Sequence, residues 1–500
     1  MLAKPLFNAL LFLGCLACSW PALADDCSDL GALALSHISI TATETKAAAT
    51  FKPARGAALA LPAHCRIAAV LSPSDDSRIA MELWLPTQWN GKFLALGNGG
   101  WAGSISFSAM AIGLQAGYAV ASNDTGHQGG SAAFALGHPE KLVDFAYRSM
   151  HAMAVQSKAI ISAFYKRGPD LSYYQGCSTG GRQGLMEAQR YPADFDAIIA
   201  GAPVYNQNAL HASQMHKLIS IIKDDSLFLP PDKIQLLHAA ILASCESQDG
   251  VADGFFNNPL ACHFEPATLL CRGSGTEACL SAAQLDTVRS VYAPATTAAG
   301  VEIYPGHATG FELAWRMPAP GSTPPALASD TFSYIAHEDA AWDWQNFDLA
   351  SDYALAREKA AFVDATDLDL SEFKARGGKL LLYHGWNDPG PSPLNTINYY
   401  EGVRQTLGGE QSDWMRLYLM PGMGHCQGGI GPDQADFLGA LASWREAGVA
   451  PEQITAARIR EGRVDMTRPL CPYPAVATWD GQGNPDDAAS YSCQESDREE

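Results

Sequence analysis

A serine between glycines is the strongest chemical signal in the sequence. Residues 176–180 read Gly-Cys-Ser-Thr-Gly, a G-x-S-x-G motif centred on Ser178. The motif follows β-type residues at 171–175 and precedes a helical pattern at 181–191, as a nucleophile at a strand-to-helix turn requires. Such a turn is sharp and strained, so it needs small residues beside the serine, and it lifts the hydroxyl clear of the sheet. We therefore predict that Ser178 is a catalytic nucleophile, against the plainer interpretation of a chance glycine-rich turn.

A nucleophilic serine needs an imidazole that accepts its proton and a carboxylate that orients the imidazole. After a serine at such a turn, these partners follow in the order acid, then histidine. Asp388 lies in the loop after a predicted strand at 379–383, and His425 lies after another at 414–420. Loops at the carboxyl ends of parallel strands converge over one crevice, so we predict a triad of Ser178, Asp388 and His425. Taken singly, an exposed turn aspartate and a capping histidine would explain the last two residues.

Cysteines stand beside two members of this predicted triad. Cys177 directly precedes Ser178, and Cys426 directly follows His425. A disulfide between them would close a very long loop and contribute on the order of 5 kcal/mol in the chain-entropy model. It would also limit drift between the hydroxyl and the imidazole, where a displacement of about one ångström matters.

An ester-cleaving serine also needs two backbone N–H groups that face the developing negative oxygen. Thr179 supplies one by its position directly after the nucleophile. The sequence Gly-Asn-Gly-Gly-Trp at 97–101 follows a predicted strand at 93–96, and we assign the second N–H to Gly100, with Gly99 as the next choice. A plain tight turn is the alternative interpretation of these glycines.

Several of these segments together are similar to one family. The stretch Gly-Cys-Ser-Thr-Gly-Gly-Arg-Gln-Gly at 176–184, the Asp388 loop and the pair His425-Cys426 resemble the tannase and feruloyl esterase family, and the resemblance covers most of the chain. It implies hydrolysis, through an acyl-enzyme, of esters of phenolic or aromatic acids such as feruloyl esters; galloyl esters and mono(2-hydroxyethyl) terephthalate are the alternative substrates. It also implies five disulfides, 27–65, 177–426, 245–262, 271–279 and 471–493, whereas proximity in sequence by itself favours only the last three.

An acidic stretch at 245–255 predicts a metal site. Carboxylates stand at 246, 249 and 253 between glycines that let the chain curl, and hard oxygen ligands at this density suit calcium. The family resemblance implies a structural Ca²⁺ ion bound by a set of side chains and carbonyl oxygens from Glu246, Asp249, Val251, Asp253 and Phe255. The plain alternative is an acidic surface turn.

Four residues are candidates for the substrate pocket. Phe311 and Trp342 could stack on a planar acyl group, although aromatic residues in such a stretch more often form core. Arg316 would favour a substrate with a free carboxylate, such as a terephthalate half-ester. His384 could line the pocket or pair with the backbone.

The order of predicted elements suggests how these residues are positioned. Strand and helix patterns alternate from about residue 66 to 203, give way to a stretch rich in proline, glycine, cysteine and aromatic residues, and resume near 379. This order predicts an α/β fold with β/α units around a parallel sheet. We predict an α/β-hydrolase core of residues 25–203 and 367–500, interrupted by an inserted lid at 204–366 that carries the calcium loop.

The N-terminus predicts export. Residues 1–24 contain Lys4, an apolar run and Ala-Leu-Ala before Asp25, so we expect a signal peptide cleaved after Ala24 and a secreted or periplasmic protein. Ten of the twelve cysteines lie after it, an even number that suits disulfides in an oxidising compartment. No later apolar stretch reaches the roughly 18 residues of a membrane span, so we expect no stable membrane insertion.

Charge narrows the class of partner. The chain has a formal charge of −20, and loss of the leader with its single lysine makes it −21. Such a charge repels nucleic acid and favours a small neutral or weakly charged ester, although acidity also simply keeps exported proteins soluble. The leading hypothesis is a carboxylic ester hydrolase. A non-catalytic binding module on a hydrolase scaffold and a serine peptidase are the alternatives, and the sequence leaves the oligomeric state open.

Overall fold

A computed structural model describes residues 24–495, apart from 53–57, 102, 247–248 and 274–276. The predicted signal peptide therefore lies, except for Ala24, outside the described residues. The first helix, α1, spans Ala24–Asp29.

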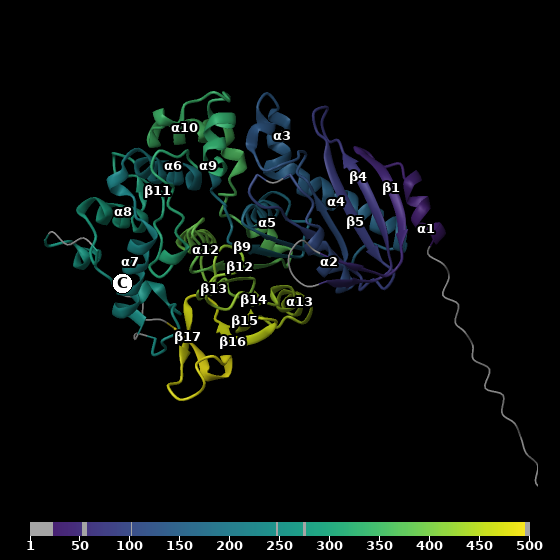
Figure 1. Cartoon of the computed structure of the whole chain (residues 1–500). Coiled ribbons are helices and arrows are strands. Elements are labelled where there is room, and N and C mark those ends of the chain that lie inside the picture. Colours follow the sequence, from purple (N-terminus) through teal and green to yellow (C-terminus); the bar gives the residue numbers. More distant parts are fainter. Residues whose placement is uncertain (1–23, 53–57, 102, 247–248, 274–276, 496–500) are drawn as a thin grey trace, which may run out of the picture.

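One large mixed sheet forms the centre of the molecule (Figure 1). Its nine strands, in spatial order, are β1 (Ile38–Lys46), β4 (His64–Leu71), β5 (Ile79–Pro86), β7 (Ala119–Asn123), β6 (Lys92–Leu96), β8 (Leu171–Cys177), β9 (Ala197–Gly201), β12 (Lys379–Gly385) and β13 (Met415–Met420). The strands from β7 to β13 in this order are parallel to one another.

The parallel arrangement predicted from the β/α pattern does not extend to the first strands of the sheet. The pairs β1–β4, β4–β5 and β5–β7 are antiparallel. The link between β4 and β5, residues 72–78, is too short for the crossover of roughly a dozen residues that parallel neighbours need.

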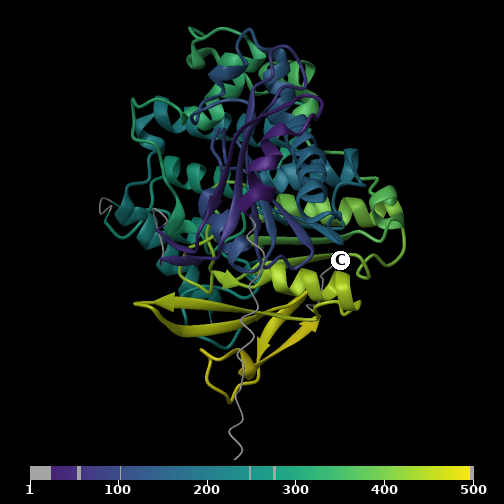
Figure 2. The same ribbon diagram turned by 90° about the vertical axis from the view of Figure 1, so that its right-hand side faces the viewer.

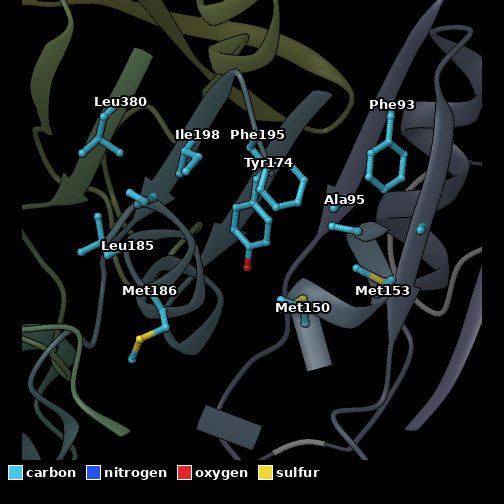
Figure 3. Packing of buried hydrophobic residues seen from close by; sticks show 14 of the residues in the cluster. Phe93, Ala95, Met150, Met153, Tyr174, Leu185, Met186, Phe195, Ile198 and Leu380 are labelled. Atoms are coloured by element: carbon cyan, nitrogen blue, oxygen red, sulfur yellow. The ribbon is translucent and has the colours of Figure 1, made fainter. Parts of the chain in front are cut away.

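Helices cover both faces of this sheet. One face packs against α4 (Ser149–Tyr165), α5 (Thr179–Arg190), α11 (Ser371–Ala375) and α12 (Pro393–Leu407), and the other against α2 (Phe107–Gln115) and α13 (Phe437–Ala447). Successive residues of β6 alternate between the two cores: Phe93 and Ala95 belong to the first, Leu94 and Leu96 to the second. Figure 3 shows side chains of α4 and α5 facing the strands of the first core. Because both faces are buried, the central strands are mainly apolar.

The segment between β9 and β12 is mostly helical and has cores of its own. Its main elements are α6 (Gln207–Lys223), α7 (Pro231–Cys245), α8 (Ala282–Tyr292), β10 (Ala295–Thr296), β11 (Glu302–Tyr304), α9 (Ala326–Asp330) and α10 (Leu349–Ala360). One core gathers α7 and α8, and another gathers α6 and α10. In Figure 1 these helices lie together to one side of the sheet. The division of the chain at 203/204 and 366/367 stays a prediction.

The last residues add a small β layer. It contains β14 (Gln434–Ala435), β15 (Ile454–Arg460), β16 (Arg463–Leu470), β17 (Ala475–Trp479) and β18 (Tyr491–Glu495). Figures 1 and 2 show it in yellow at one end of the molecule. It is tied to the main sheet by a hydrogen bond of 2.8 Å from the Tyr473 N–H to the Leu417 carbonyl. Three short elements complete the description: β2 (Ala49–Phe51), β3 (Leu59–Leu61) and α3 (Pro139–Val143).

All five predicted disulfides are present: Cys27–Cys65, Cys177–Cys426, Cys245–Cys262, Cys271–Cys279 and Cys471–Cys493. Among the described residues, the structure contains no helix with both the length and the apolar character that a membrane span requires.

Candidate active site

Ser178 occupies a strained turn between β8 and α5. Its φ of 64° and ψ of −122° lie where non-glycine residues are rare. The neighbouring glycines make the turn possible, because a Cβ atom at Gly176 would lie 2.5 Å from the Gly180 carbonyl and one at Gly180 would lie 2.8 Å from the Asn98 carbonyl. The Ser178 N–H donates to the Gly201 carbonyl at 2.9 Å. The serine is partly exposed to solvent.

Asp388 and His425 meet at the carboxyl ends of β12 and β13. His425 Nδ1 lies 2.6 Å from Asp388 Oδ2, and the Gly390 N–H donates to Asp388 Oδ1 at 2.8 Å. The two loops pack closely, since the Asn387 N–H donates to the Met423 carbonyl at 2.9 Å. The imidazole is thus held through Nδ1, which leaves Nε2 as the nitrogen able to exchange a proton with a nucleophile.

The protonation of this pair follows from burial and hydrogen bonding. Burial would raise the pKa of Asp388, but the hydrogen bonds from His384 and His425 outweigh burial and lower it to about 2. Burial would likewise lower the pKa of His425, but the hydrogen bond and charge of Asp388 leave it raised above 6.5. The carboxylate is therefore ionised near neutral pH and stabilises an imidazolium.

The disulfide Cys177–Cys426 joins the serine turn to the histidine loop. Its Cα atoms are 6.0 Å apart, although 249 residues separate the two cysteines in the chain. Because each cysteine is the direct neighbour of a predicted triad residue, the link brings Ser178 and His425 into one region. The structure thus places all three predicted catalytic residues at the same edge of the sheet.

The predicted oxyanion residues also lie together. The Thr179 hydroxyl donates to the Gly100 carbonyl at 2.9 Å, which ties the start of α5 to the glycine loop after β6. Gly100 has a φ of 57°, and a Cβ atom at Gly99 would meet nothing within 4 Å. The loop is thus open on the side of Gly99, and the roles of the Thr179 and Gly100 N–H groups stay predictions.

Sequence reasoning missed two residues of α5, Gln183, which anchors this loop, and Arg182, which ties α5 to neighbouring segments. The Asn98 N–H donates to Gln183 Oε1 at 3.1 Å, and Gln183 Nε2 donates to Asn98 Oδ1 at 3.2 Å. Arg182 is fully buried and donates to the carbonyls of Ala146 and Val363 at 2.8 Å each. Both residues directly follow the glycines of the serine motif. Their position next to the motif was the only feature of the sequence that could have pointed to them.

Two of the four predicted substrate residues are excluded from the surface. His384 is fully buried, with Nε2 3.1 Å from Asp388 Oδ2 and Nδ1 2.7 Å from Thr396 Oγ1. It therefore positions the aspartate instead of lining a pocket. Phe311 is only 2% exposed and packs against Trp315 in the α7–α8 core. The prediction of a direct substrate contact was wrong for both residues, because each is enclosed by its own neighbours.

The other two predicted residues remain accessible. Trp342 is partly buried and stacks on the His337 ring at 4.9 Å. Arg316 is exposed. Neither observation brings them to Ser178, so their roles stay predictions.

An unpredicted apolar residue lies beside the glycine loop. Leu327 of α9 is 45% exposed, and its Cδ1 is 3.4 Å from where a Cβ atom of Gly100 would stand. The Leu327 carbonyl accepts a hydrogen bond of 2.8 Å from Trp101 Nε1. This contact makes Leu327 a candidate residue to line the site of the acyl group. The position of Leu327 next to the glycine loop is apparent only in the folded protein.

The acidic loop at 245–255 has a donor set that fits a hard cation. Glu246 Oε1 accepts from the Gly254 N–H at 2.8 Å, and Asp249 Oδ2 accepts from the Asn257 N–H at 3.2 Å. Burial raises the pKa of Asp253 to about 6 despite its ion pair with Arg468 at 2.5 Å. Asp249 and Asp253 thus share the positive charge of Arg468 while a third carboxylate, Glu246, lies near both, and oxygen ligands in this arrangement suit calcium. Residues 247–248 of this loop lie outside the described part.

Comparison with known proteins places the chain in a family. Residues 65–494 match the family model for tannase and feruloyl esterase. The chain belongs to the tannase and feruloyl esterase family. An uncharacterised esterase of Xanthomonas campestris pv. campestris is 36% identical, with 94% of this chain aligned to 92% of the relative. A probable feruloyl esterase B-2 of Aspergillus terreus is 35% identical over 86% of each protein.

Solved structures agree with this membership of the tannase and feruloyl esterase family. Feruloyl esterase B from Aspergillus oryzae superposes with a TM-score of 0.88 and 30% identity, covering 95% of this chain and 100% of that chain. Tannin acyl hydrolase from Aspergillus niger, at 22% identity and a TM-score of 0.80 over 95% of each chain, shares the fold. The predicted α/β-hydrolase fold is confirmed, and the protein is a carboxylic ester hydrolase.

Proposed function

We propose that this enzyme hydrolyses esters of aromatic acids, such as feruloyl esters, through an acyl-enzyme on Ser178. The observation that carries the proposal is the 2.6 Å contact between His425 Nδ1 and Asp388 Oδ2, linked to the Ser178 turn by the Cys177–Cys426 disulfide. The names of the feruloyl esterase relatives support the substrate class.

The proposed reaction has two steps. His425 Nε2 takes the proton of the Ser178 hydroxyl, whose oxygen attacks the ester carbonyl carbon, and the N–H groups of Thr179 and Gly100 stabilise the oxyanion. His425 then gives the proton to the departing alcohol. Water, activated in the same way, hydrolyses the acyl-enzyme and releases the aromatic acid. The buried carboxylate of Asp388 holds the imidazole throughout.

A panel of methyl esters tests this proposal. Methyl ferulate, methyl gallate and mono(2-hydroxyethyl) terephthalate are compared by kcat/KM, with casein as a peptidase substrate. Ser178→Ala is expected to abolish ester turnover, while Ser220→Ala, which removes a hydroxyl that donates to the His216 carbonyl within α6, keeps it. Full ester turnover by Ser178→Ala would refute the mechanism. Preference for casein would refute the substrate class.

We also infer that Ca²⁺ binds the loop at 245–255. The ion would be held by Glu246, Asp249 and Asp253 side chains with the Val251 and Phe255 carbonyls, and it would serve stability. The loop packs against the C-terminal β layer, where Val251 contacts the core around Cys471. Excess EDTA is expected to lower the Tm, and an unchanged Tm would contradict the site.

We further infer that the protein is exported. Five disulfides support an oxidising compartment. N-terminal sequencing of the mature protein tests the predicted cleavage after Ala24, and an intact N-terminus on protein retained in the cytoplasm would contradict it.

A further inference from the structure

Three side chains able to bind a metal ion meet near the end of α5 opposite Ser178. His151 lies in α4, Glu187 lies in α5, and Asp194 lies in the turn between α5 and β9. One ligand atom from each lies within 4.8 Å of the other two. His151 Nδ1 is already 2.6 Å from Asp194 Oδ2. The group thus combines one imidazole nitrogen with two carboxylate oxygens from three separate elements.

The second carboxyl group of this cluster is buried without an N–H donor. Glu187 is 1% exposed, and within the described part of the chain no N–H group donates to its carboxyl oxygens, which face the carboxyl group of Asp194. Leaving a buried polar group without a hydrogen-bond donor is unfavourable. A bound cation would remove this cost.

The nearby Lys158 does not take the place of a cation bound to these carboxyl groups. The Lys158 ammonium group donates to the backbone carbonyl of Asp194, not to its carboxylate. Burial lowers the pKa of Lys158, although Asp194, Asp196 and Glu187 oppose the shift. The lysine therefore contributes positive charge at the edge of the cluster while the carboxyl oxygens remain available.

The cluster is open to solvent on one side and held firmly on the other. The His151 side chain is 34% exposed, and its ring stacks on Tyr191 at 3.8 Å. The sequence neighbours Met150 and Met186 are buried in the first core, where Figure 3 shows both packed under the sheet. Packing thus fixes α4 and α5 relative to each other while an ion can enter past the imidazole.

We propose that His151, Glu187 and Asp194 form a binding site for a divalent transition-metal ion of the zinc type. Zn²⁺ takes imidazole nitrogen and carboxylate oxygen at roughly 2.0 to 2.2 Å, whereas calcium takes oxygen ligands. Three protein ligands leave a fourth position for water on the exposed side. When the ion binds, the Glu187 proton passes to solvent, and bonds to the metal replace the His151–Asp194 hydrogen bond. The ion would join α4, α5 and the turn before β9 and stabilise the layer behind the nucleophile helix.

Metal titration of the full mature protein tests the proposal. The protein is stripped with chelator, resaturated with Ca²⁺ so that the acidic loop is filled, and titrated with Zn²⁺ by calorimetry and with Co²⁺ by visible absorption. We expect one high-affinity equivalent, proton release on binding and a rise in Tm. His151→Gln should weaken Zn²⁺ binding by about tenfold or more, since losing even a group outside the coordination sphere costs about 10- to 100-fold. Ester turnover without zinc should not change.

A matched histidine provides the control. His138 Nδ1 lies 3.0 Å from Asp76 Oδ1 in an exposed pair on the surface, and His138→Gln should leave the zinc affinity at the wild-type value. Glu187→Gln should lose zinc binding as well. If this buried variant fails to fold, His151→Gln, at a partly exposed position, still decides the outcome. Absence of a stoichiometric zinc site in the wild-type protein, or equal zinc affinity of the His151 and His138 variants, would overturn the proposal.

Discussion

The Cys177–Cys426 disulfide offers the sharpest test of how the fold supports catalysis. Replacing both cysteines by alanine opens a loop of 249 residues, whereas the same change at Cys271 and Cys279 opens a loop of only 8. The chain-entropy model gives a loss in unfolding free energy of about 5.5 kcal/mol for the first pair and about 2.5 kcal/mol for the second. The two variants therefore differ in predicted stability by about 3 kcal/mol.

The two disulfides also differ in what they hold. Cys177 and Cys426 adjoin Ser178 and His425. Cys271 and Cys279 instead lie in the segment just before α8, far from the triad residues in the chain. Since a misplacement of about one ångström between reacting groups costs about 100-fold, we expect kcat to fall by about that factor in the first variant. The lid variant should keep its kcat.

Equilibrium urea unfolding and ester kinetics, measured well below each melting temperature, separate these two effects. The expected pattern is a large loss of both stability and kcat in the Cys177→Ala, Cys426→Ala variant and a small loss of stability alone in the Cys271→Ala, Cys279→Ala variant. Equal losses of stability in the two variants would refute the loop-length reasoning. Full kcat in the first variant would refute the positioning role of the disulfide.

Three further predictions concern groups around Asp388 and the glycine loop. Because the pKa of His425 is raised above 6.5, kcat/KM of the wild-type enzyme should rise with pH, with a midpoint above that value. Asp388→Asn should lower the pH of this midpoint and should lower kcat/KM by about 10⁴-fold. A pH–rate profile of both proteins checks this. The pKa of Asp388 is lowered from 3.8 to about 2, so its stabilising contribution is complete above pH 3.8 and disappears as the pH falls toward 2. His384→Phe removes one hydrogen-bond donor to Asp388, so the midpoint of acid unfolding, followed by tryptophan fluorescence, should shift to higher pH. An unshifted midpoint would show that this donor is unimportant. Gln183→Leu breaks the pair with Asn98 and should lower kcat by about 10-fold or more with little change in KM; a change confined to KM would assign the loop to substrate binding instead.

The positions proposed to be catalytic could be chosen from the sequence because each depends on local chemistry. Ser178 is identified by glycines that a sharp turn requires, and the structure shows that a Cβ atom at Gly176 or Gly180 would clash with the backbone. Asp388 and His425 each follow a strand, and β12 and β13 end side by side. The helix α13 after β13 begins at Phe437, where the Asp436 carboxylate accepts from the Gly439 N–H at 2.8 Å and caps it.

Other features depend on contacts that leave no local pattern. The antiparallel direction of β4 and β5 follows from a short link, while their residues alternate as in any strand. Phe311 and Trp342 belong to the same aromatic stretch, yet one is buried in a core and the other is half-exposed. Residue type therefore could not assign these residues to the pocket or to the interior.

The sequence by itself determined the choice of the proposed nucleophile, the order of its proposed partners, the even set of cysteines and the acidic loop, because turn sterics, redox chemistry and ligand type are encoded within a few neighbouring residues. Only the tertiary structure decided that His384 supports Asp388 from inside the protein, that Gln183 anchors the glycine loop, and that Leu327 stands beside Gly100. These roles arise where segments far apart in the chain come within a few ångströms. Such contacts are set by the packing of whole helices and strands, and no short stretch of sequence contains them.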